Sequence, residues 1–135
     1  PTRGAVAAAG GMGPRRARNL GLLLAHLVGG LHLSLAVTKA ADMSSLPRAG
    51  IIFFRVFFDR LFLTLDEEKF IAVFDRVAGA KDALSVKENV LIFLHEHMKT
   101  IPESWSDADK KKFKKRRKVA KGCLESMSGL DNSMA

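Results

Sequence analysis

An uncharged, leucine-rich stretch near the N-terminus, residues 20–37, constrains the fold of this chain more than any other feature. It holds eight leucines in eighteen residues, and three arginines (Arg15, Arg16, Arg18) precede it. As one helix it would be about 27 Å long, close to the roughly 30 Å hydrocarbon core of a bilayer. We therefore predict a single apolar helix over residues 20–38 that crosses a membrane. The alternatives are burial in other protein and a targeting segment.

The net charge of +8 is concentrated at the two ends of the chain. Residues 1–48 carry six basic and one acidic side chain, residues 49–105 carry seven and nine, and residues 106–135 carry nine and four. A near-neutral middle between two basic ends predicts a folded body whose termini contact an anionic partner. We predict that residues 1–19, which contain no acidic residue, form a basic arm rich in Gly, Ala and Arg, as in organellar targeting sequences.

Residues 51–65 predict a helix that is apolar on two sides. They hold five of the nine phenylalanines in the chain, and at 100° per residue most of these share one apolar arc. Ile52, Val56 and Leu63 form a second apolar strip, so this helix is expected to be packed on both sides. The alternative is a β-strand over residues 51–58, because aromatic and β-branched residues favour strands.

Three further helices are predicted by one start signal, a hydroxyl side chain three residues before a carboxylate. The pairs are Thr64 with Glu67, Ser85 with Glu88, and Ser106 with Asp109. Apolar stripes at helical spacing follow each pair. Because short loops join these helices, residues 50–128 predict a small antiparallel helical bundle, with residues 129–135 as a C-terminal tail. The predicted fold class is all-α, one N-terminal apolar transmembrane helix followed by this bundle.

Two histidines inside the leucine-rich stretch are candidate cofactor ligands. His26 and His32 would lie about 120° apart around a helix, so they would not share one metal ion. Each is a candidate axial ligand for a haem or a chlorophyll, because a polar group inside a membrane is a functional candidate. The alternative is a hydrogen bond to a neighbouring subunit. The single cysteine, Cys123, excludes an internal disulfide and a multi-cysteine metal site.

The densest charge lies in residues 110–121, where nine of twelve side chains are basic. The predicted partner- or lipid-binding residues are the three arginines before the leucine-rich stretch and Lys110, Lys111, Lys112, Lys114, Lys115, Arg116, Arg117 and Lys118. An acidic protein face, anionic lipid headgroups and RNA phosphates are the partner classes, and a solvated surface is the remaining interpretation. Phe113 is the one aromatic residue within the run, which argues against base stacking on single strands.

Enzyme motifs are missing from the sequence. The glycines at positions 10, 11 and 13 precede a proline and arginines rather than opening a phosphate-binding loop. Spacing indicates no Ser-His-Asp or Cys-His set, and no zinc site. Arg55 and Asp59, at i and i+4, predict a structural ion pair that fixes helix register rather than a proton-transfer pair.

These features together predict a non-catalytic accessory subunit of a large organellar membrane complex, either respiratory, ATP-synthase or photosynthetic. It would scaffold contacts between protein subunits at the mitochondrial inner membrane or the thylakoid, with the bundle on the side opposite the N-terminus. The fold requires no cofactor, and bound lipid, chlorophyll or haem stays open. The alternatives are an organellar ribosomal or RNA-binding protein and a pigment- or haem-carrying membrane subunit.

Overall fold

The computed structural model describes residues 13–31, 33–79 and 82–134, with side chains described through residue 126. In this part of the chain every regular element is helical, so the all-α prediction is confirmed and the strand alternative over residues 51–58 is wrong. The elements in order are α2 (Pro14–Gly29), η1 (Leu35–Ala40), α3 (Arg48–Thr64), α4 (Glu67–Asp75), η2 (Arg76–Gly79), α5 (Ala83–His97) and α6 (Asp107–Met134).

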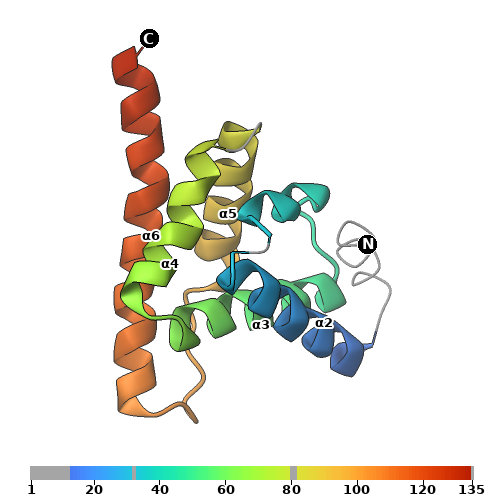
Figure 1. Cartoon of the computed structure of the whole chain (residues 1–135). Coiled ribbons are helices and arrows are strands. Elements are labelled where there is room, and N and C mark those ends of the chain that lie inside the picture. Colours follow the sequence, from blue (N-terminus) through green and yellow to red (C-terminus); the bar gives the residue numbers. More distant parts are fainter. Residues whose placement is uncertain (1–12, 32, 80–81, 135) are drawn as a thin grey trace.

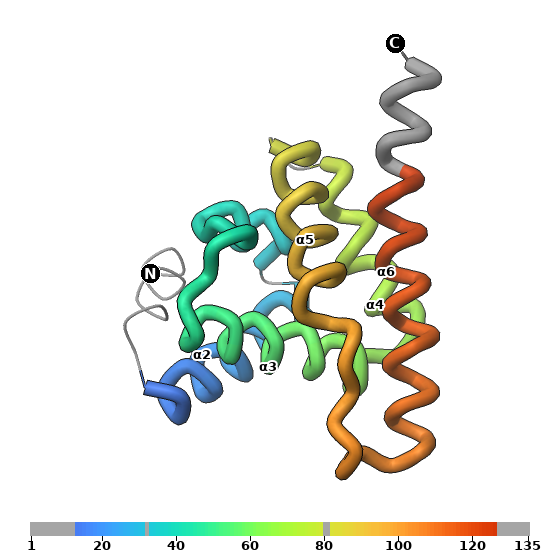
Figure 2. The backbone as a smooth tube through the Cα atoms, turned by 180° about the vertical axis from the view of Figure 1, so that it is seen from behind, coloured from blue at the N-terminus to red at the C-terminus, as the bar shows by residue number. Residues whose placement is uncertain are grey.

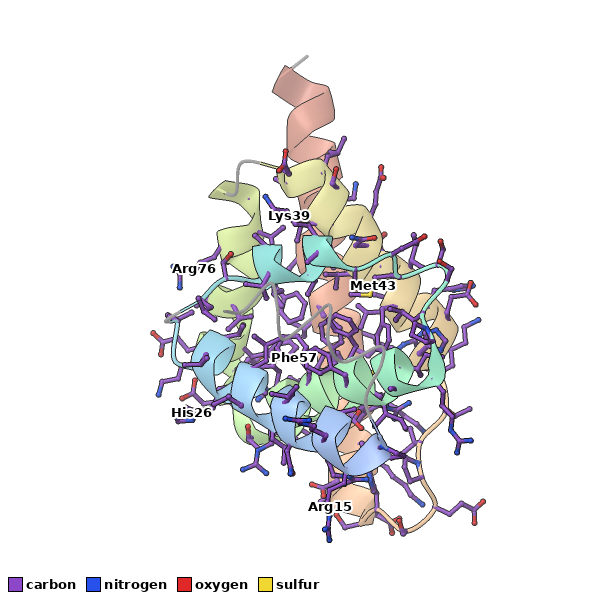
Figure 3. All side chains as sticks on the ribbon, turned by 90° about the vertical axis from the view of Figure 1, so that its right-hand side faces the viewer. Arg15, His26, Lys39, Met43, Phe57 and Arg76 are labelled. Carbon is purple, nitrogen blue, oxygen red and sulfur yellow. The ribbon has the colours of Figure 1, made fainter. Side chains whose placement is uncertain are left out.

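α3 is the central helix, because its buried side chains recur in pairs every four residues along one wide face. The pairs are Ala49–Gly50, Phe53–Phe54, Phe57–Phe58 and Leu61–Phe62. All nine phenylalanines of the chain are at most 1% exposed. Their rings meet edge-on or stacked, as in the contact of Phe58 with Phe93 at 5.4 Å between centroids. Figure 3 shows Phe57 within the hydrophobic core, to which α3, α4, α5 and α6 contribute phenylalanines and α2 contributes aliphatic side chains.

α2 packs on α3 through small residues, which let the two backbones approach closely. The buried small residues recur every four positions and are Ala17, Gly21, Ala25 and Gly29. A Cβ atom on Gly21 would lie 2.5 Å from the carbonyl oxygen of Phe53, so no side chain fits there. Gly29 lies against the Leu61 and Leu65 side chains. Because the later glycine of α2 contacts later residues of α3, the two helices run parallel and side by side (Figure 1).

The leucine-rich stretch is not one helix, so the single apolar helix predicted over residues 20–38 is wrong. α2 begins at Pro14, which places the three arginines assigned to the arm inside this helix, and it ends at Gly29. The part of residues 30–38 that is described contains a turn and most of η1. Across the described residues, no helix is both long enough and apolar enough to cross a bilayer.

The turn after α2 explains why the helix stops. The backbone N–H of Gly30 donates to the carbonyl of His26, and that of Leu31 donates to the carbonyl of Val28, both at 3.0 Å. Leu31 adopts a φ of 63°, the left-handed conformation at which helices commonly end. Arg76 holds this turn against η2, since its Nη1 donates to the Leu31 carbonyl at 2.8 Å.

α4, α5 and α6 run in alternating directions, as short loops predict, whereas α2 and α3 lie across them (Figures 1 and 2). Leu24 and Val28 of α2 belong to the same hydrophobic core as α5 and α6. The tail predicted for residues 129–135 is helical as far as Met134. Most of the predicted N-terminal arm, residues 1–12, lies outside the described residues.

Of the three predicted capping hydroxyls, only that of Ser106 caps a helix. It accepts a hydrogen bond from the backbone N–H of Asp109 at 3.1 Å. α4 is capped instead by Asp66, whose Oδ1 accepts from the backbone N–H of Lys69 at 2.8 Å. The Thr64 hydroxyl donates to the carbonyl of Arg60 within α3, and Ser85 already lies inside α5. At α4, Asp66, two residues after Thr64, therefore caps the helix in place of the predicted hydroxyl.

Candidate functional site

The basic run on α6 contains two cations that belong to the fold. Lys112 Nζ donates to the carbonyl of Leu63 at 3.0 Å, and Arg116 Nη1 donates to the carbonyl of Leu65 at 2.8 Å. These carbonyls lie at the C-terminal end of α3, where cations complement the helix dipole. Arg116 is 7% exposed, and its guanidinium lies 4.9 Å from the centroid of the Phe70 ring. Both side chains thus hold α6 against the end of α3.

Four other lysines of the run face outward together and form what we call the lysine strip. Its members are Lys111, Lys114, Lys115 and Lys118, all exposed. At 100° per residue they fall within an arc of about 100° on α6. The two ion pairs found in the described part of the chain lie elsewhere, between Lys39 and Asp82 and between Arg55 and Asp59. The lysine strip is therefore a concentrated positive surface.

Two further basic residues of the run, Lys110 and Arg117, lie half-buried beside the lysine strip. The Nε atom of Arg117 is buried and has no hydrogen-bond partner among the described side chains. From the sequence, all eight of these basic residues were predicted to bind a partner or lipid together. The structure instead divides them into an exposed strip, half-buried flanks and two cations that bind α3.

The arginines at the start of α2 form a separate exposed group. Arg15, Arg16 and Arg18 are all exposed on its first turns, and the first turn contains no acidic residue. Positive charge at a helix N-terminus opposes the helix dipole, so these arginines do not stabilise α2. α2 begins on the side of the molecule opposite α6 (Figures 1 and 2). The fold therefore does not bring the two basic regions into one patch.

Arg55 and Asp59 form the predicted ion pair on α3, with Arg55 Nε 2.9 Å and 3.0 Å from the two carboxylate oxygens. Arg55 Nη1 also donates to the carbonyl of His97, the last residue of α5, at 2.8 Å. Its guanidinium lies 5.9 Å from the Trp105 ring and 5.1 Å from the Phe113 ring. One arginine therefore contacts α3, the end of α5 and the start of α6.

Burial raises the pKa of Asp59 to about 6, and the neighbouring Arg55 charge opposes this rise only in part. A carboxyl that is partly removed from water is harder to ionise, even beside a cation. The Asp59 side chain is 20% exposed, so it faces an opening in the surface rather than the closed core.

Of the two candidate cofactor histidines, the structure describes only His26. His26 is exposed on the outer side of α2 (Figure 3), and His32 lies outside the described residues. His97 packs on Phe93, with 5.0 Å between ring centroids. Where the structure is described, no three His, Cys, Asp or Glu side chains gather as a metal site would require.

Cys123 is half-buried on α6, and its surroundings disfavour the thiolate. Burial raises the pKa of the thiol first, and the negative charge of Asp75 together with its hydrogen bond raises it further. Because the thiolate is the reactive form, this cysteine is poorly suited to act as a nucleophile.

Sequence reasoning missed an open groove on the outer side of α3. The second apolar strip of this helix was expected to be packed, but Ile52, Val56 and Leu63 remain half-exposed and line a groove of about 650 Å³. The alternation of these three residues with Arg55, Asp59 and Arg60 was the available signal, because a fully packed face does not carry charges at every turn.

Comparison with known proteins assigns no family to this arrangement. No family model, no curated protein and no solved structure matches the chain. The function is therefore argued from the lysine strip, the groove and the contacts that hold them in place.

Proposed function

We propose that the protein is a non-catalytic accessory subunit of a larger assembly, and that its lysine strip docks on an acidic face of a partner protein. The observation that carries this proposal is the division of the basic run. Lys112 and Arg116 bind carbonyl groups at the end of α3, whereas the four lysines of the strip are exposed together. Holding α6 in place does not need this second set of charges.

The lysine strip costs free energy while it is unbound. Lys111 and Lys115 are i,i+4 neighbours, as are Lys114 and Lys118, and two more contacts occur at i,i+3. Like charges at such spacings destabilise a helix by roughly 0.2–0.5 kcal/mol per pair, which gives about 1–2 kcal/mol in total. An acidic partner surface replaces this repulsion with attraction and raises the rate of encounter. The cost is therefore consistent with a binding role.

The wider part of the proposal is that the assembly is an organellar membrane complex, respiratory, ATP-synthase or photosynthetic, in which this subunit scaffolds contacts. It is supported by the arginine-rich start of the sequence, which contains no acidic residue before Asp42. It is also supported by the outer face of α2, where Leu22 and Leu23 are 38% and 54% exposed close to the arginines in sequence. Exposed apolar and basic side chains on one helix suit a membrane surface or a subunit interface.

RNA binding is the alternative, because phosphate groups also attract exposed lysines. Recognition of single strands relies on exposed aromatic rings on which bases stack. All nine phenylalanines are at most 1% exposed, and Trp105 packs edge-on against Phe113 with 5.5 Å between centroids. Burial of the phenylalanines leaves Trp105 as the one half-buried ring among the Phe and Trp side chains. A single ring is too few for base stacking along a strand, which favours a protein partner over single-stranded RNA.

A blue-native gel of the source organelle, with mass spectrometry of the chains that co-migrate, tests the proposal. The informative variant is K114E/K118E, which reverses two charges of the lysine strip. The matched control is R48E/K99E, which makes the same change in net charge at two other exposed positions. We expect the control to stay in the high-molecular-weight band and K114E/K118E to leave it.

A K114E/K118E variant that remains in the assembly at the level of the control contradicts docking through the lysine strip. Dispersal of the assembly by ribonuclease, with unchanged protein levels, supports the RNA alternative. Circular dichroism of both variants separates loss of docking from loss of folding.

A further inference from the structure

The outer strip of α3 forms the floor of an open groove with mostly apolar walls. α2 supplies one wall, and the segment between α5 and α6 supplies the other. The apolar side chains that line the groove include Leu22, Ile52, Val56, Leu63, Ile101 and Trp105. At about 650 Å³ the groove is within the size range of sites that hold small organic molecules. Its apolar character makes an apolar occupant favourable.

A second hollow of about 360 Å³ adjoins this groove. Leu22, Arg60 and Thr64 line both, so the two openings share a wall. The charged and titratable side chains around the second hollow are His26, Arg60 and Lys69, with no acidic residue among its lining residues. All three are exposed, so they are available to a ligand. This hollow therefore suits an anion.

Both openings carry an excess of positive charge among their lining residues. In the groove the Asp59 carboxylate is paired with Arg55 at 2.9 Å, and Arg18 and Arg60 also line the groove, so this opening is cationic as well as apolar. In the hollow the cations of Arg60 and Lys69 have no carboxylate among the lining residues. Cations thus line both openings, with Arg60 on the wall that they share, and the larger apolar surface lies in the groove.

We propose that this combined site binds one anionic phospholipid, with an acyl chain in the groove and the phosphate in the hollow between Arg60 and Lys69. A guanidinium and an ammonium group are the usual protein partners of a phosphate. An acidic peptide fits less well, because it would place its carboxylates against the mostly apolar walls of the groove. The site is lined by α2, α3, α4 and the segment between α5 and α6 and shares no residue with the lysine strip, so the inference goes beyond the proposed function.

Trp105 offers a direct readout, because it is the one tryptophan of the chain and it lines the groove. Bromine atoms on an acyl chain quench tryptophan fluorescence only on close contact. The experiment adds phosphatidylcholine vesicles, with a minor fraction of phosphatidic acid brominated on its acyl chains, to the full-length protein. We expect quenching of Trp105, and little quenching when the brominated chains are on the phosphatidylcholine instead.

The matched variants separate binding in the groove from attraction to a charged surface. R60Q/K69Q removes two cations from the hollow, and K114Q/K118Q removes two from the lysine strip. Because each basic residue near an anionic lipid surface contributes on the order of 1 kcal/mol, we expect R60Q/K69Q to need about tenfold or more lipid for half-maximal quenching. K114Q/K118Q should need the same amount of lipid as the wild type for half-maximal quenching of Trp105. Circular dichroism confirms that each variant is folded.

Three results would overturn the proposal. Equal weakening of both variants indicates adsorption through general positive charge. Co-sedimentation with vesicles without quenching of Trp105 places the lipid outside the groove. A higher melting temperature in inorganic phosphate, with no quenching by brominated lipid, indicates a phosphate site in the hollow and no acyl chain in the groove. Because none of these results involves the lysine strip's partner, the proposed function is tested separately.

Discussion

Substitution of Gly21 by alanine tests the close contact between α2 and α3. A Cβ atom at this position would lie 2.5 Å from the Phe53 carbonyl oxygen, where ordinary contacts begin at 3.4 Å. The two backbones must therefore separate by about 0.9 Å, a gap that forfeits roughly a quarter to a half of the dispersion energy along the contact. The neighbouring small residues of α2 lose contact as well.

The magnitude follows from two opposing effects. Overpacking of this kind costs about 1–3 kcal/mol, and the collision with backbone rather than with a movable side chain places Gly21 at the upper end. Replacing a helical glycine by alanine recovers about 1 kcal/mol of helix propensity. We therefore expect G21A to lower the free energy of unfolding by about 2 kcal/mol, and the melting temperature by roughly 5–10 °C.

Gly122 provides the matched control, because it lies inside α6 and no atom lies within 4 Å of where its Cβ would be. G122A should raise the free energy of unfolding by about 0.5–1 kcal/mol. Urea denaturation followed by far-ultraviolet circular dichroism measures both variants on the same scale. If G21A is as stable as G122A, α2 does not approach α3 as closely as described, and the packing argument fails.

Three further predictions concern individual side chains. Asp59 holds its proton more tightly in the folded state, with a pKa of about 6 against an ordinary 3.8. The free energy of unfolding should therefore fall by on the order of 3 kcal/mol as pH rises from about 4 to 6. D59N should remove this fall from a pH series of urea titrations. R116A should lower the free energy of unfolding by about 2–3 kcal/mol, through the lost carbonyl bond and the lost stem packing, whereas K115A should change it by less than about 0.5 kcal/mol. S106A should cost about 1 kcal/mol in thermal unfolding and S85A close to none, since only Ser106 caps a helix; equal losses would contradict the assignment of the caps.

The helical nature of the chain and most of its core were predictable from the sequence. Apolar spacing identified the helices after residue 50, and the i,i+4 spacing of Arg55 and Asp59 predicted their contact. What pattern alone missed was the function of the glycines near the N-terminus. Gly21 and Gly29 lie in the stretch expected to cross a membrane, whereas in the structure they and Ala25 form a face of small residues that packs on α3.

The extent of the leucine-rich helix was mispredicted for a local reason. Eighteen uncharged residues suggested one continuous helix, but the chain turns after Gly29 with Leu31 in the left-handed conformation, and Arg76 fixes that turn from far along the sequence. The division of the basic run was likewise beyond sequence reasoning. Which lysine or arginine binds a carbonyl of α3 depends on where α6 lies, and that is set by tertiary packing.

The central claim is that α2 packs on α3 and ends at Gly29. One wall of the groove and the outer face of α2 depend on this packing. A ¹³C-edited NOESY spectrum of the full-length protein measures this contact directly. The account predicts cross-peaks between the α-protons of Gly29 and the δ-methyl groups of Leu61 and Leu65, whose carbon atoms lie 3.1–3.7 Å from where a Cβ on Gly29 would be. Their absence from a fully assigned spectrum, with contacts within α3 present, would contradict it.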